Sequence, residues 1–266
     1  MAMLCESFDF HRIKELDNGE WIFQIKLDGE RAIYREGKLF NRRDKDISFR
    51  FPELMKELEI LHTRVGYLEL DGEIVILTGG RPDFKALLSR THLSTRSKIE
   101  NALLKNPAVY FVFDILLDKQ LSIEMRNKLL QSIITPDFHH IHLLKTYSDG
   151  EKLWNYAYEN KLEGIIAKRK GSSYEDRRSP AWLKIKRWNT DRIRAVSYES
   201  NNRILSTLIL ESGDRVGSGL SDFEQVKLKE AIDEGKKPLI EIRWLDDGQY
   251  EAKRQPTILG VLDYGE

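Results

Sequence analysis

The sequence of residues 26–31 is KLDGER, which fits the pattern K-x-D-G-x-R. A pattern with four fixed positions would occur by chance in a chain of 266 residues about once in 600 sequences. Residues 21–26, WIFQIK, alternate as expected for a strand, with Gln24 and Lys26 on one face. The Asp-Gly pair that follows predicts a tight turn before a return strand. Lys26 is therefore expected at a strand end, where its side chain projects into a cleft.

A lysine in such a position can act as a nucleophile at phosphorus, provided that it loses its proton. Neighbouring cations lower the pKa of a lysine, because they disfavour its charged form. The strand-like WLKIK at residues 182–186 offers Lys184 and Lys186 on one face, and we expect these two to lower the pKa of Lys26. Taken alone, the K-x-D-G-x-R pattern also fits a hairpin turn with a surface ion pair.

Three further strings follow in a set order along the chain. ELDGE at residues 69–73 places three carboxylates on one strand face, which is costly unless a cation shares them. YFVFD at residues 110–114 sets an aromatic side chain beside a carboxylate. EGIIAK at residues 163–168 sets a carboxylate beside an apolar strand. Each string alone also fits an ordinary edge or core strand, so their order and spacing carry the argument.

The sequence changes character near residue 187. Residues 1–187 alternate predicted helices, such as 52–62, with strands, which indicates an α+β domain. Residues 188–266 contain short strand candidates and one helix, which indicates a small β-barrel of the oligonucleotide-binding type. Capping boxes predict two helix starts, formed by Ser148 with Glu151 and by Ser221 with Glu224.

The charge of the chain is balanced overall but uneven along the sequence. There are 43 basic and 43 acidic residues, and a zero net charge by itself argues mildly against a nucleic-acid partner. Residues 168–194, however, carry ten basic and three acidic side chains, a net charge of +7. Local positive fields govern phosphate binding. We therefore expect Arg177, Arg178 and Arg187 to contact the phosphates of a DNA duplex.

The composition excludes several classes of protein. No run of about 18 apolar residues occurs, so no membrane association is expected. The single cysteine, Cys5, excludes an internal disulfide framework and a four-cysteine zinc site. A reducing, cytoplasmic setting is the corresponding expectation.

In their order, these strings resemble the motif series of the nucleotidyltransferase superfamily, which contains DNA ligases, RNA ligases and mRNA capping enzymes. ELDGEIV, FVFDIL, EGIIAK and WLKIK are most similar to ATP-dependent DNA ligases, in particular to the ligase modules of bacterial end-joining enzymes. SGLS at residues 218–221 and RQP at residues 254–256 resemble the barrel domain of those enzymes. The resemblance implies a nucleotidyltransferase (adenylation) domain at residues 1–187 and an oligonucleotide-binding domain at residues 188–266.

The resemblance also implies roles for individual residues. Lys26 would form a covalent lysyl-AMP. The nucleotide would be bound by Gln24 at the adenine amino group, Phe113 stacked on the base, Glu73 and Arg31 at the ribose, Arg42 at the ribose and phosphate, Lys184 and Lys186 at the α-phosphate, and Arg254. The implied cofactors are ATP and Mg²⁺ or Mn²⁺, with the metal at Glu163 and Glu73.

Two positions depart from the pattern of the family. Asp44 stands where a glycine is usual after Arg42. Leu262 stands where an arginine is expected, and the lysine that commonly follows is missing. Because those basic groups orient the pyrophosphate of ATP, we expect self-adenylation to be slow relative to the later steps.

The sequence thus predicts a monomeric ATP-dependent DNA ligase that seals nicks in double-stranded DNA. Only about 20 residues precede the first strand, so we expect the grip on the duplex to come from the two domains or from a DNA-tethering repair protein. An RNA ligase or RNA end-repair enzyme stays open as an alternative, as does a nucleic-acid-binding relative with impaired catalysis. An NAD-dependent ligase is disfavoured by the single cysteine. Roles in DNA replication, repair and end joining are left undecided.

Overall fold

The computed structural model describes residues 2–201, 204–245 and 253–265. The chain divides into two compact units, Met1–Ile185 and Lys186–Glu266, which are considered separately below. The predicted ranges 1–187 and 188–266, as functional domains, stay a prediction.

The first unit contains two sheets. One sheet has the order β4-β3-β5-β7-β8, with β6 paired to β5. The other has the order β1-β10-β9-β2. The strands of the first sheet are β3 (Glu30–Arg35), β4 (Lys38–Asn41), β5 (Leu70–Thr78), β6 (Arg81–Pro82), β7 (Ala108–Ile115) and β8 (Ile141–Leu143). Those of the second are β1 (Leu4–Ser7), β2 (Trp21–Ile25), β9 (Gly164–Arg169) and β10 (Arg178–Lys186).

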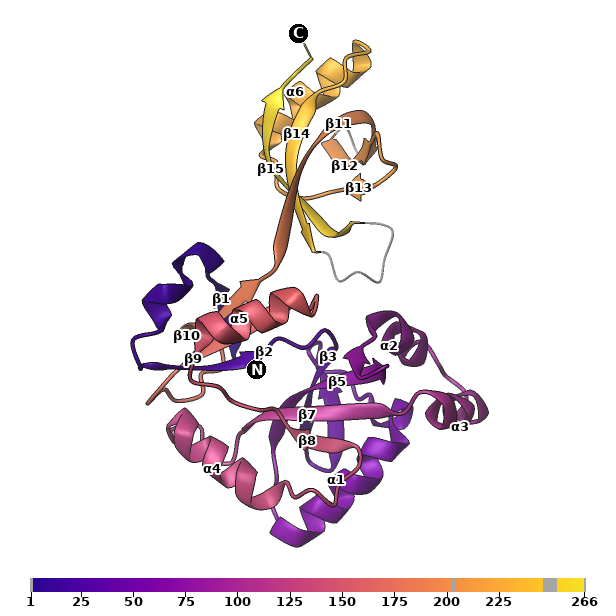
Figure 1. Ribbon diagram of the computed structural model, residues 1–266. Coiled ribbons are helices and arrows are strands. Elements are labelled where there is room, and N and C mark those ends of the chain that lie inside the picture. The colour runs from indigo at the N-terminus through magenta and orange to yellow at the C-terminus, as the bar shows by residue number, and fades with distance from the viewer. Residues whose placement is uncertain (1, 202–203, 246–252, 266) are drawn as a thin grey trace. The chain divides into compact units, whose positions relative to one another are not determined.

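Helices cover both sheets of this unit (Figure 1). The helices are η1 (Phe10–Leu16), η2 (Ser48–Arg50), α1 (Pro52–Val65), α2 (Phe84–Thr91), α3 (Arg96–Lys105), α4 (Ile123–Ile133) and α5 (Gly150–Glu159). α1 and α4 pack against β7, and α5 packs against β2 and β9. The apolar stripe of α1, with Leu54, Leu58 and Leu61, is fully buried in one core, whereas Phe23 and Trp154 lie in a second core beneath α5.

The predicted hairpin after Lys26 is wrong. β2 pairs with β9, whereas β3 pairs with β4 and β5, so the Asp28-Gly29 segment crosses from one sheet to the other. Gly29 makes this crossing possible: a Cβ atom there would lie 2.3 Å from the carbonyl oxygen of Ile74 and 2.8 Å from Cγ of Glu73. The missing side chain therefore lets the segment just before β3 lie directly against β5.

The second unit is a five-stranded sheet with one helix. Its strand order is β13-β12-β11-β14-β15, and α6 (Asp222–Asp233) packs against β11 and β12. The strands are β11 (Trp188–Asn201), β12 (Ile204–Leu210), β13 (Arg215–Val216), β14 (Leu239–Leu245) and β15 (Arg254–Asp263). The first half of β11 pairs with β14 and the second half with β12, so this long strand belongs to both halves of the sheet.

The predicted fold class, α+β followed by a small strand-rich unit with one helix, is confirmed. The closed barrel is not: over the part of the chain that the structure describes, the five strands form an open path. One predicted helix start is confirmed, since Ser221 and Glu224 form a capping box at α6. The other is wrong by one residue, because the side chain of Asp149, not that of Ser148, accepts from the backbone at the start of α5.

Candidate active site

Lys26 is the residue directly after β2, and it lies beside Gly164, the first residue of the neighbouring strand β9. Its backbone N–H donates to the carbonyl oxygen of Gly164 at 2.9 Å, and its Nζ forms an ion pair with the carboxylate of Glu163. The Lys26 side chain is 22% exposed and that of Glu163 is 7% exposed, so the pair is largely shielded from solvent. The motif lysine and the carboxylate of EGIIAK, far apart in the sequence, are thereby brought into direct contact.

The pKa of Lys26 is raised, contrary to the expectation that cations would lower it. Burial by itself lowers the pKa, but the negative charges of Glu163 and Glu73 outweigh burial. The basic residues of WLKIK suggested a lowered pKa, but the carboxylates that act on Lys26 are those of Glu163 and Glu73, which come from other strings of the sequence. In the free protein Lys26 is therefore an ammonium ion held by Glu163.

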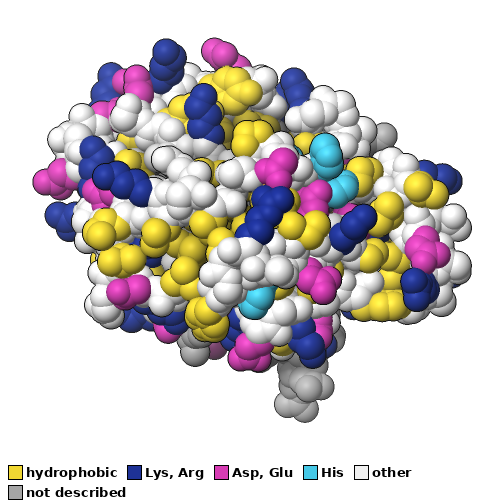
Figure 2. All heavy atoms as spheres, turned by 90° about the horizontal axis from the view of Figure 1, so that it is seen from below, with side chains coloured by type: hydrophobic (Ala, Val, Ile, Leu, Met, Phe, Trp, Pro, Cys, Tyr) yellow, Lys and Arg dark blue, Asp and Glu magenta, His cyan; other side chains and the backbone are white. Residues whose placement is uncertain are grey.

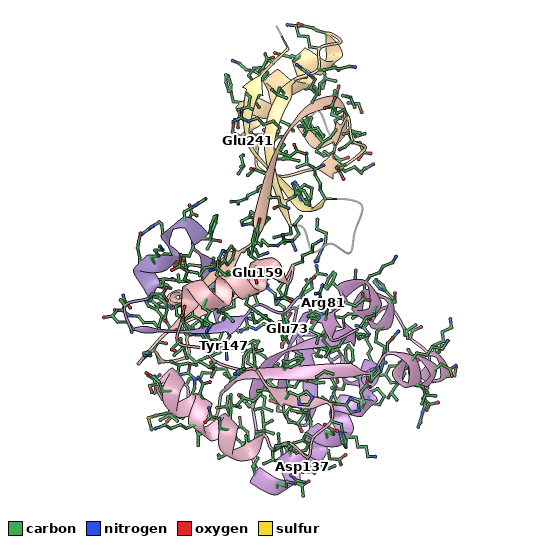
Figure 3. All side chains as sticks on the ribbon, viewed as in Figure 1. Glu73, Arg81, Asp137, Tyr147, Glu159 and Glu241 are labelled. Atoms are coloured by element: carbon green, nitrogen blue, oxygen red, sulfur yellow. The ribbon has the colours of Figure 1, made fainter. Side chains whose placement is uncertain are left out.

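Glu73 lies on β5, in the region between the two sheets (Figure 3). Burial raises the pKa of Glu73 to about 8, although Lys26 and Arg31 oppose the shift, and Glu163 and Asp71 add to it. Glu73 and Glu163 thus form a crowded acidic pair around Lys26. The three carboxylates predicted to share a cation are distributed otherwise, because Asp71 pairs with Arg31 and Glu69 accepts from Tyr67.

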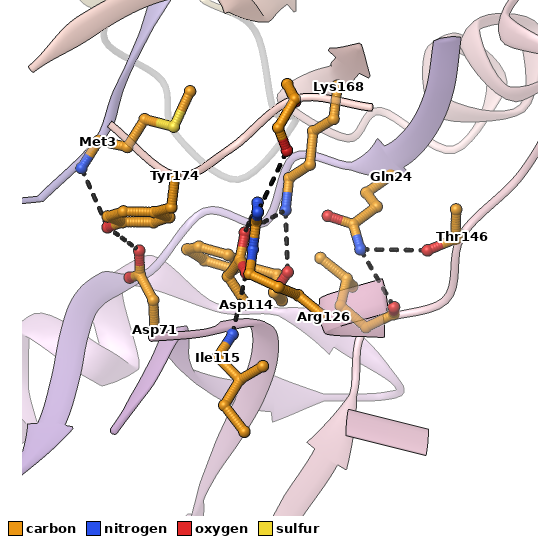
Figure 4. A network of polar contacts seen from close by, with 12 residues as sticks. Met3, Gln24, Asp71, Asp114, Ile115, Arg126, Thr146, Lys168 and Tyr174 are labelled. Atoms are coloured by element: carbon orange, nitrogen blue, oxygen red, sulfur yellow. Dashed lines mark hydrogen bonds and ion pairs between the residues drawn. The ribbon is translucent and has the colours of Figure 1, made fainter. Parts of the chain in front are cut away.

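Arg31 bonds to a buried network of Met3, Asp71 and Tyr174, and Figure 4 shows the hydrogen bonds that join these three residues. Its Nε and Nη2 donate to the two carboxylate oxygens of Asp71 at 2.9 and 2.5 Å, and its Nη1 donates to the carbonyl oxygen of Met3 at 2.6 Å. The Tyr174 hydroxyl donates to Asp71 at 2.7 Å and accepts from the Met3 N–H at 3.0 Å. Bidentate pairing fixes the plane of a guanidinium, so Arg31 has a defined orientation beside Phe113, 5.4 Å from its ring centre.

Phe113 packs against the buried Lys168, for which the sequence predicted no role. Nζ of Lys168 donates to the Phe113 carbonyl oxygen at 2.9 Å and lies 4.8 Å from the Phe113 ring centre and 4.1 Å from that of Trp182. Burial lowers the pKa of Lys168 to about 8, although Asp114 and Asp71 oppose the shift. The two rings meet edge to face at 6.0 Å. Phe113 is thus a ring of fixed orientation at the edge of the site.

Gln24 is 1% exposed and turns its amide group toward the segment after β8. Its Nε2 donates to the carbonyl oxygen of Leu144 and to Oγ1 of Thr146, both at 3.3 Å. The sequence placed Gln24 on the face of Lys26 but gave no sign of these two partners.

Four further residues are predicted to contact the nucleotide, namely Lys184, Lys186, Arg254 and Arg42. Lys184 lies opposite Ser7 on β1, and its charge, like those of Arg31, Lys168 and Lys26, opposes the raised pKa that burial gives the Cys5 thiol. Lys26 and Lys184 therefore face a common region. Lys186 and Arg254 belong to the second unit, where Lys186 donates to Gln255 at 3.1 Å. Arg42 is exposed in the turn after β4.

The predicted DNA contacts differ among themselves. Arg177 is exposed and forms an ion pair with Glu175. Arg178 is also exposed, and its Nη1 donates to the carbonyl oxygen of Cys5. Arg187 is only 7% exposed. Because their side chains are exposed, Arg177 and Arg178 are better suited than Arg187 to contact phosphates.

A metal ion at this site would need oxygen ligands beyond the protein. Among residues 2–201, 204–245 and 253–265, no group of three or more His, Cys, Asp or Glu side chains could hold a metal ion. Glu163 and Glu73 nevertheless fit Mg²⁺, which is commonly bound by one or two carboxylates together with substrate phosphates. Burial is the main cause of the raised pKa of Glu73, and a divalent cation bound there would oppose it by favouring the charged carboxylate.

None of the helices that the structure describes is long and apolar enough to cross a membrane.

Comparison with known proteins gives concordant results. Residues 2–186 match the family model described as ATP dependent DNA ligase domain. The chain is 30% identical over 225 residues to the SPbeta prophage-derived DNA ligase-like protein LigB of Bacillus subtilis, covering 80% of this chain and 77% of LigB. It is 28% identical over 247 residues to the bifunctional non-homologous end joining protein LigD of the same organism, covering 81% of this chain but 40% of LigD.

Solved structures show the same fold. A structure from a study of Lig E DNA ligases aligns with a TM-score of 0.76 at 16% identity, covering 98% of each chain. The ligase domain of LigD from M. tuberculosis aligns with a TM-score of 0.60 at 23% identity, covering 98% of this chain and 94% of that domain. Solved structures of the same fold thus cover nearly the whole chain.

Proposed function

Because the chain belongs to the ATP-dependent DNA ligase domain family, we propose that it seals nicks in duplex DNA through a lysyl-AMP intermediate on Lys26. The observation that supports this proposal most directly is the position of Lys26. The K-x-D-G-x-R lysine stands at a strand end, in contact with Glu163 and within the field of Glu73, while Arg31 and Phe113 lie next to one another. The site thus offers a nucleophile, two carboxylates and a ring for a base.

In the proposed first step, the neutral Lys26 amine attacks the α-phosphorus of ATP. A nitrogen–phosphorus bond forms, the bond from phosphorus to the bridging oxygen breaks, and pyrophosphate leaves. AMP then passes to the 5′-phosphate of the nick, which releases Lys26, and the 3′-hydroxyl displaces AMP as the strand is joined. Phosphoryl transfer leaves little covalent work to other side chains, so charge and positioning dominate.

The other residues have supporting roles in this proposal. Phe113 stacks on the base and Gln24 accepts from its amino group, while Arg31 and Glu73 hold the ribose. Arg42, Lys184, Lys186 and Arg254 meet the phosphates. A Mg²⁺ or Mn²⁺ ion at Glu163 and Glu73 would neutralise the two charges that raise the pKa of Lys26, which favours the amine that attacks.

Incubation with ATP labelled at the α-phosphate tests the proposal. We expect a covalent labelled adduct whose label passes to the 5′-phosphate of added nicked DNA and is released as AMP when the nick is sealed, more efficiently than with nicked RNA. Lys26→Ala should form no adduct while keeping the circular-dichroism spectrum of a folded protein, although its melting temperature should fall because the buried carboxylate of Glu163 loses its partner. Adduct formed by Lys26→Ala would exclude Lys26 as the nucleophile. Release of the label on nicked RNA alone would favour an RNA ligase, and DNA binding without adduct would favour an impaired relative.

The cellular setting is part of the proposal as well. The chain spans 40% of the length of LigD, so a role in end joining, with a DNA-tethering repair protein as partner, extends beyond what the matched region covers.

We further propose that the chain acts as a monomer in the cytoplasm, since its one cysteine suits a reducing compartment. Light scattering on the purified protein would contradict the monomer if it gave twice the mass of 31.1 kDa.

A further inference from the structure

Both donor positions of the Gln24 amide are occupied by the protein. One N–H of Nε2 points to the carbonyl oxygen of Leu144 and the other to Oγ1 of Thr146. A backbone carbonyl can only accept, so the nitrogen of the amide must face Leu144 and cannot exchange places with the oxygen. The polarity of this buried side chain is therefore set by its neighbours.

The amide oxygen of Gln24 is consequently directed away from Thr146, as Figure 4 shows. Of the residues that the structure describes, none donates a hydrogen bond to this oxygen. A ligand or a water molecule can therefore donate to this oxygen. The side chain thus presents one unsatisfied acceptor and no free donor.

The two groups that hold the amide are themselves fixed. The N–H of Leu144 donates to the carbonyl oxygen of Val112 on β7 at 2.8 Å. Tyr147 and Phe23 of β2 exchange two backbone hydrogen bonds, each of 2.8 Å. Residues 144–147 therefore join β7, which carries Phe113, to β2, which carries Gln24. The distance between the ring and the amide is set by this short segment.

We propose that Thr146 is a positioning residue that determines base specificity: the Leu144 carbonyl sets which end of the Gln24 amide it faces, and Thr146 holds the amide plane so that the oxygen points toward the base. An amino group at position 6 of a purine donates to that oxygen, whereas a 6-oxo group would place two acceptors face to face. The site therefore selects a 6-amino purine over a 6-oxo purine. This inference rests on the proposed function, in which Gln24 meets the base of the nucleotide.

ATP and inosine triphosphate test the inference, because the two bases differ only at position 6 and at the adjoining ring nitrogen. The quantity measured is the ratio of adduct formation rates with the two nucleotides at subsaturating concentration. We expect Thr146→Val to lower this ratio about tenfold, since the amide loses one of its two fixed partners. Thr146→Ser keeps the hydroxyl and should keep the ratio. Thr63→Val, the same change on exposed α1, is the matched control.

A double-mutant cycle separates positioning from general damage. If Thr146 acts through Gln24, the ratio should fall in Gln24→Met, and adding Thr146→Val should lower it no further. Additive losses, or a ratio unchanged in Thr146→Val, would overturn the inference.

The outcome also distinguishes the inference from the proposed function. A wild-type protein that forms adducts equally well with both nucleotides keeps the function and overturns the inference. A protein that forms no adduct at all contradicts the proposed function. The inference is then tested separately by calorimetry, which compares the affinities of wild type and Thr146→Val for ATP and for inosine triphosphate. Equal affinities for both nucleotides would overturn it in that case too.

Discussion

Lys26 holds its proton more tightly than an ordinary lysine, and this has a consequence for the pH dependence of catalysis. The pKa lies above its usual value, so at neutral pH only a small fraction of the side chain is the neutral amine. Below the pKa this fraction rises about tenfold per pH unit. At subsaturating ATP, where the rate reports the pKa of the free protein, self-adenylation should therefore speed up from pH 7 to pH 9 without reaching a plateau.

Glu163→Gln tests the origin of that shift. The change removes the negative charge in contact with Lys26, so the pKa of Lys26 should fall and the normalised pH–rate profile of adduct formation should move to lower pH. The absolute rate should fall as well if Glu163 holds a metal ion. Glu159→Gln, an exposed carboxylate on α5, serves as the control. Profiles that superimpose after normalisation would show that Glu163 does not set the pKa of Lys26.

Asp44 illustrates how a departure from the family pattern is accommodated. The residue adopts a φ of 59°, the left-handed conformation that a glycine enters without cost. Its carboxylate also accepts from Nη2 of Arg35 at 2.6 Å. The local turn is thus kept with an aspartate in the position of the usual glycine, at a strain of about 1 kcal/mol.

Two substitutions at this position should have unequal effects on stability. Asp44→Ala keeps the left-handed strain and loses the ion pair, whereas Asp44→Gly loses the ion pair but relieves the strain. We expect the glycine variant to be more stable than the alanine variant by about 1 kcal/mol in urea unfolding. Equal midpoints for the two variants would mean that the turn changes its conformation when Asp44 is replaced.

At the scale of elements, the sequence predicted those helices and strands that are determined by interactions between residues close together in the chain. The strand before Lys26, the helix α1 and the capping box of α6 all follow from neighbours in the sequence. The pairing of β2 and β3 in different sheets does not, because it depends on Gly29 packing against β5. Turn chemistry alone could not distinguish a hairpin from a crossing between sheets.

The same limit applies to the site. K-x-D-G-x-R and EGIIAK identified Lys26 and Glu163 as candidates before their contact was known. The partners that orient the site come from distant segments: Met3 meets Tyr174 across 171 residues, and Gln24 meets Thr146 across 122. Nothing in a single sequence marks a backbone carbonyl or a lone threonine as the group that fixes another side chain.

Strand β15 carries the second departure from the family pattern. Leu262 is 47% exposed, so an arginine could replace it without burying a charge. Leu262→Arg should speed adduct formation more than it speeds sealing of a pre-adenylated nick, because the added cation meets the pyrophosphate only in the first step. Leu259→Arg, on the same strand and 45% exposed, is the matched control. Equal acceleration of both steps would place the effect elsewhere.

At the scale of the whole molecule, basic and acidic residues are equal in number. Figure 2 shows basic and acidic side chains interspersed over one face of the molecule. The equal totals of 43 basic and 43 acidic residues agree with this view. Any grip on DNA must therefore depend on local groups such as the stretch of +7 at residues 168–194.

Replacing Arg177 and Arg178 together should weaken the salt dependence of DNA binding. Each phosphate that a protein neutralises releases about 0.9 counterion, so the slope of log affinity against log salt should fall by up to about 2. Adduct formation with ATP should persist. A double variant of Arg64 and Arg96, which are exposed and paired with carboxylates as Arg177 is, controls for loss of charge. An unchanged slope would exclude Arg177 and Arg178 from the phosphate contacts.

The pairing of β1 with β10 has a consequence for how the chain is made. Residues Leu4–Ser7 lie parallel to a strand that begins at Arg178, so β1 has no partner until most of the first unit has left the ribosome. At about 5–20 residues per second, the wait is on the order of 10–30 s. Met3, which holds Arg31 and Tyr174, reaches its place only then. The proposed nucleotide site is therefore completed among the last parts of the first unit, and a nascent chain arrested before residue 178 should not form the adduct.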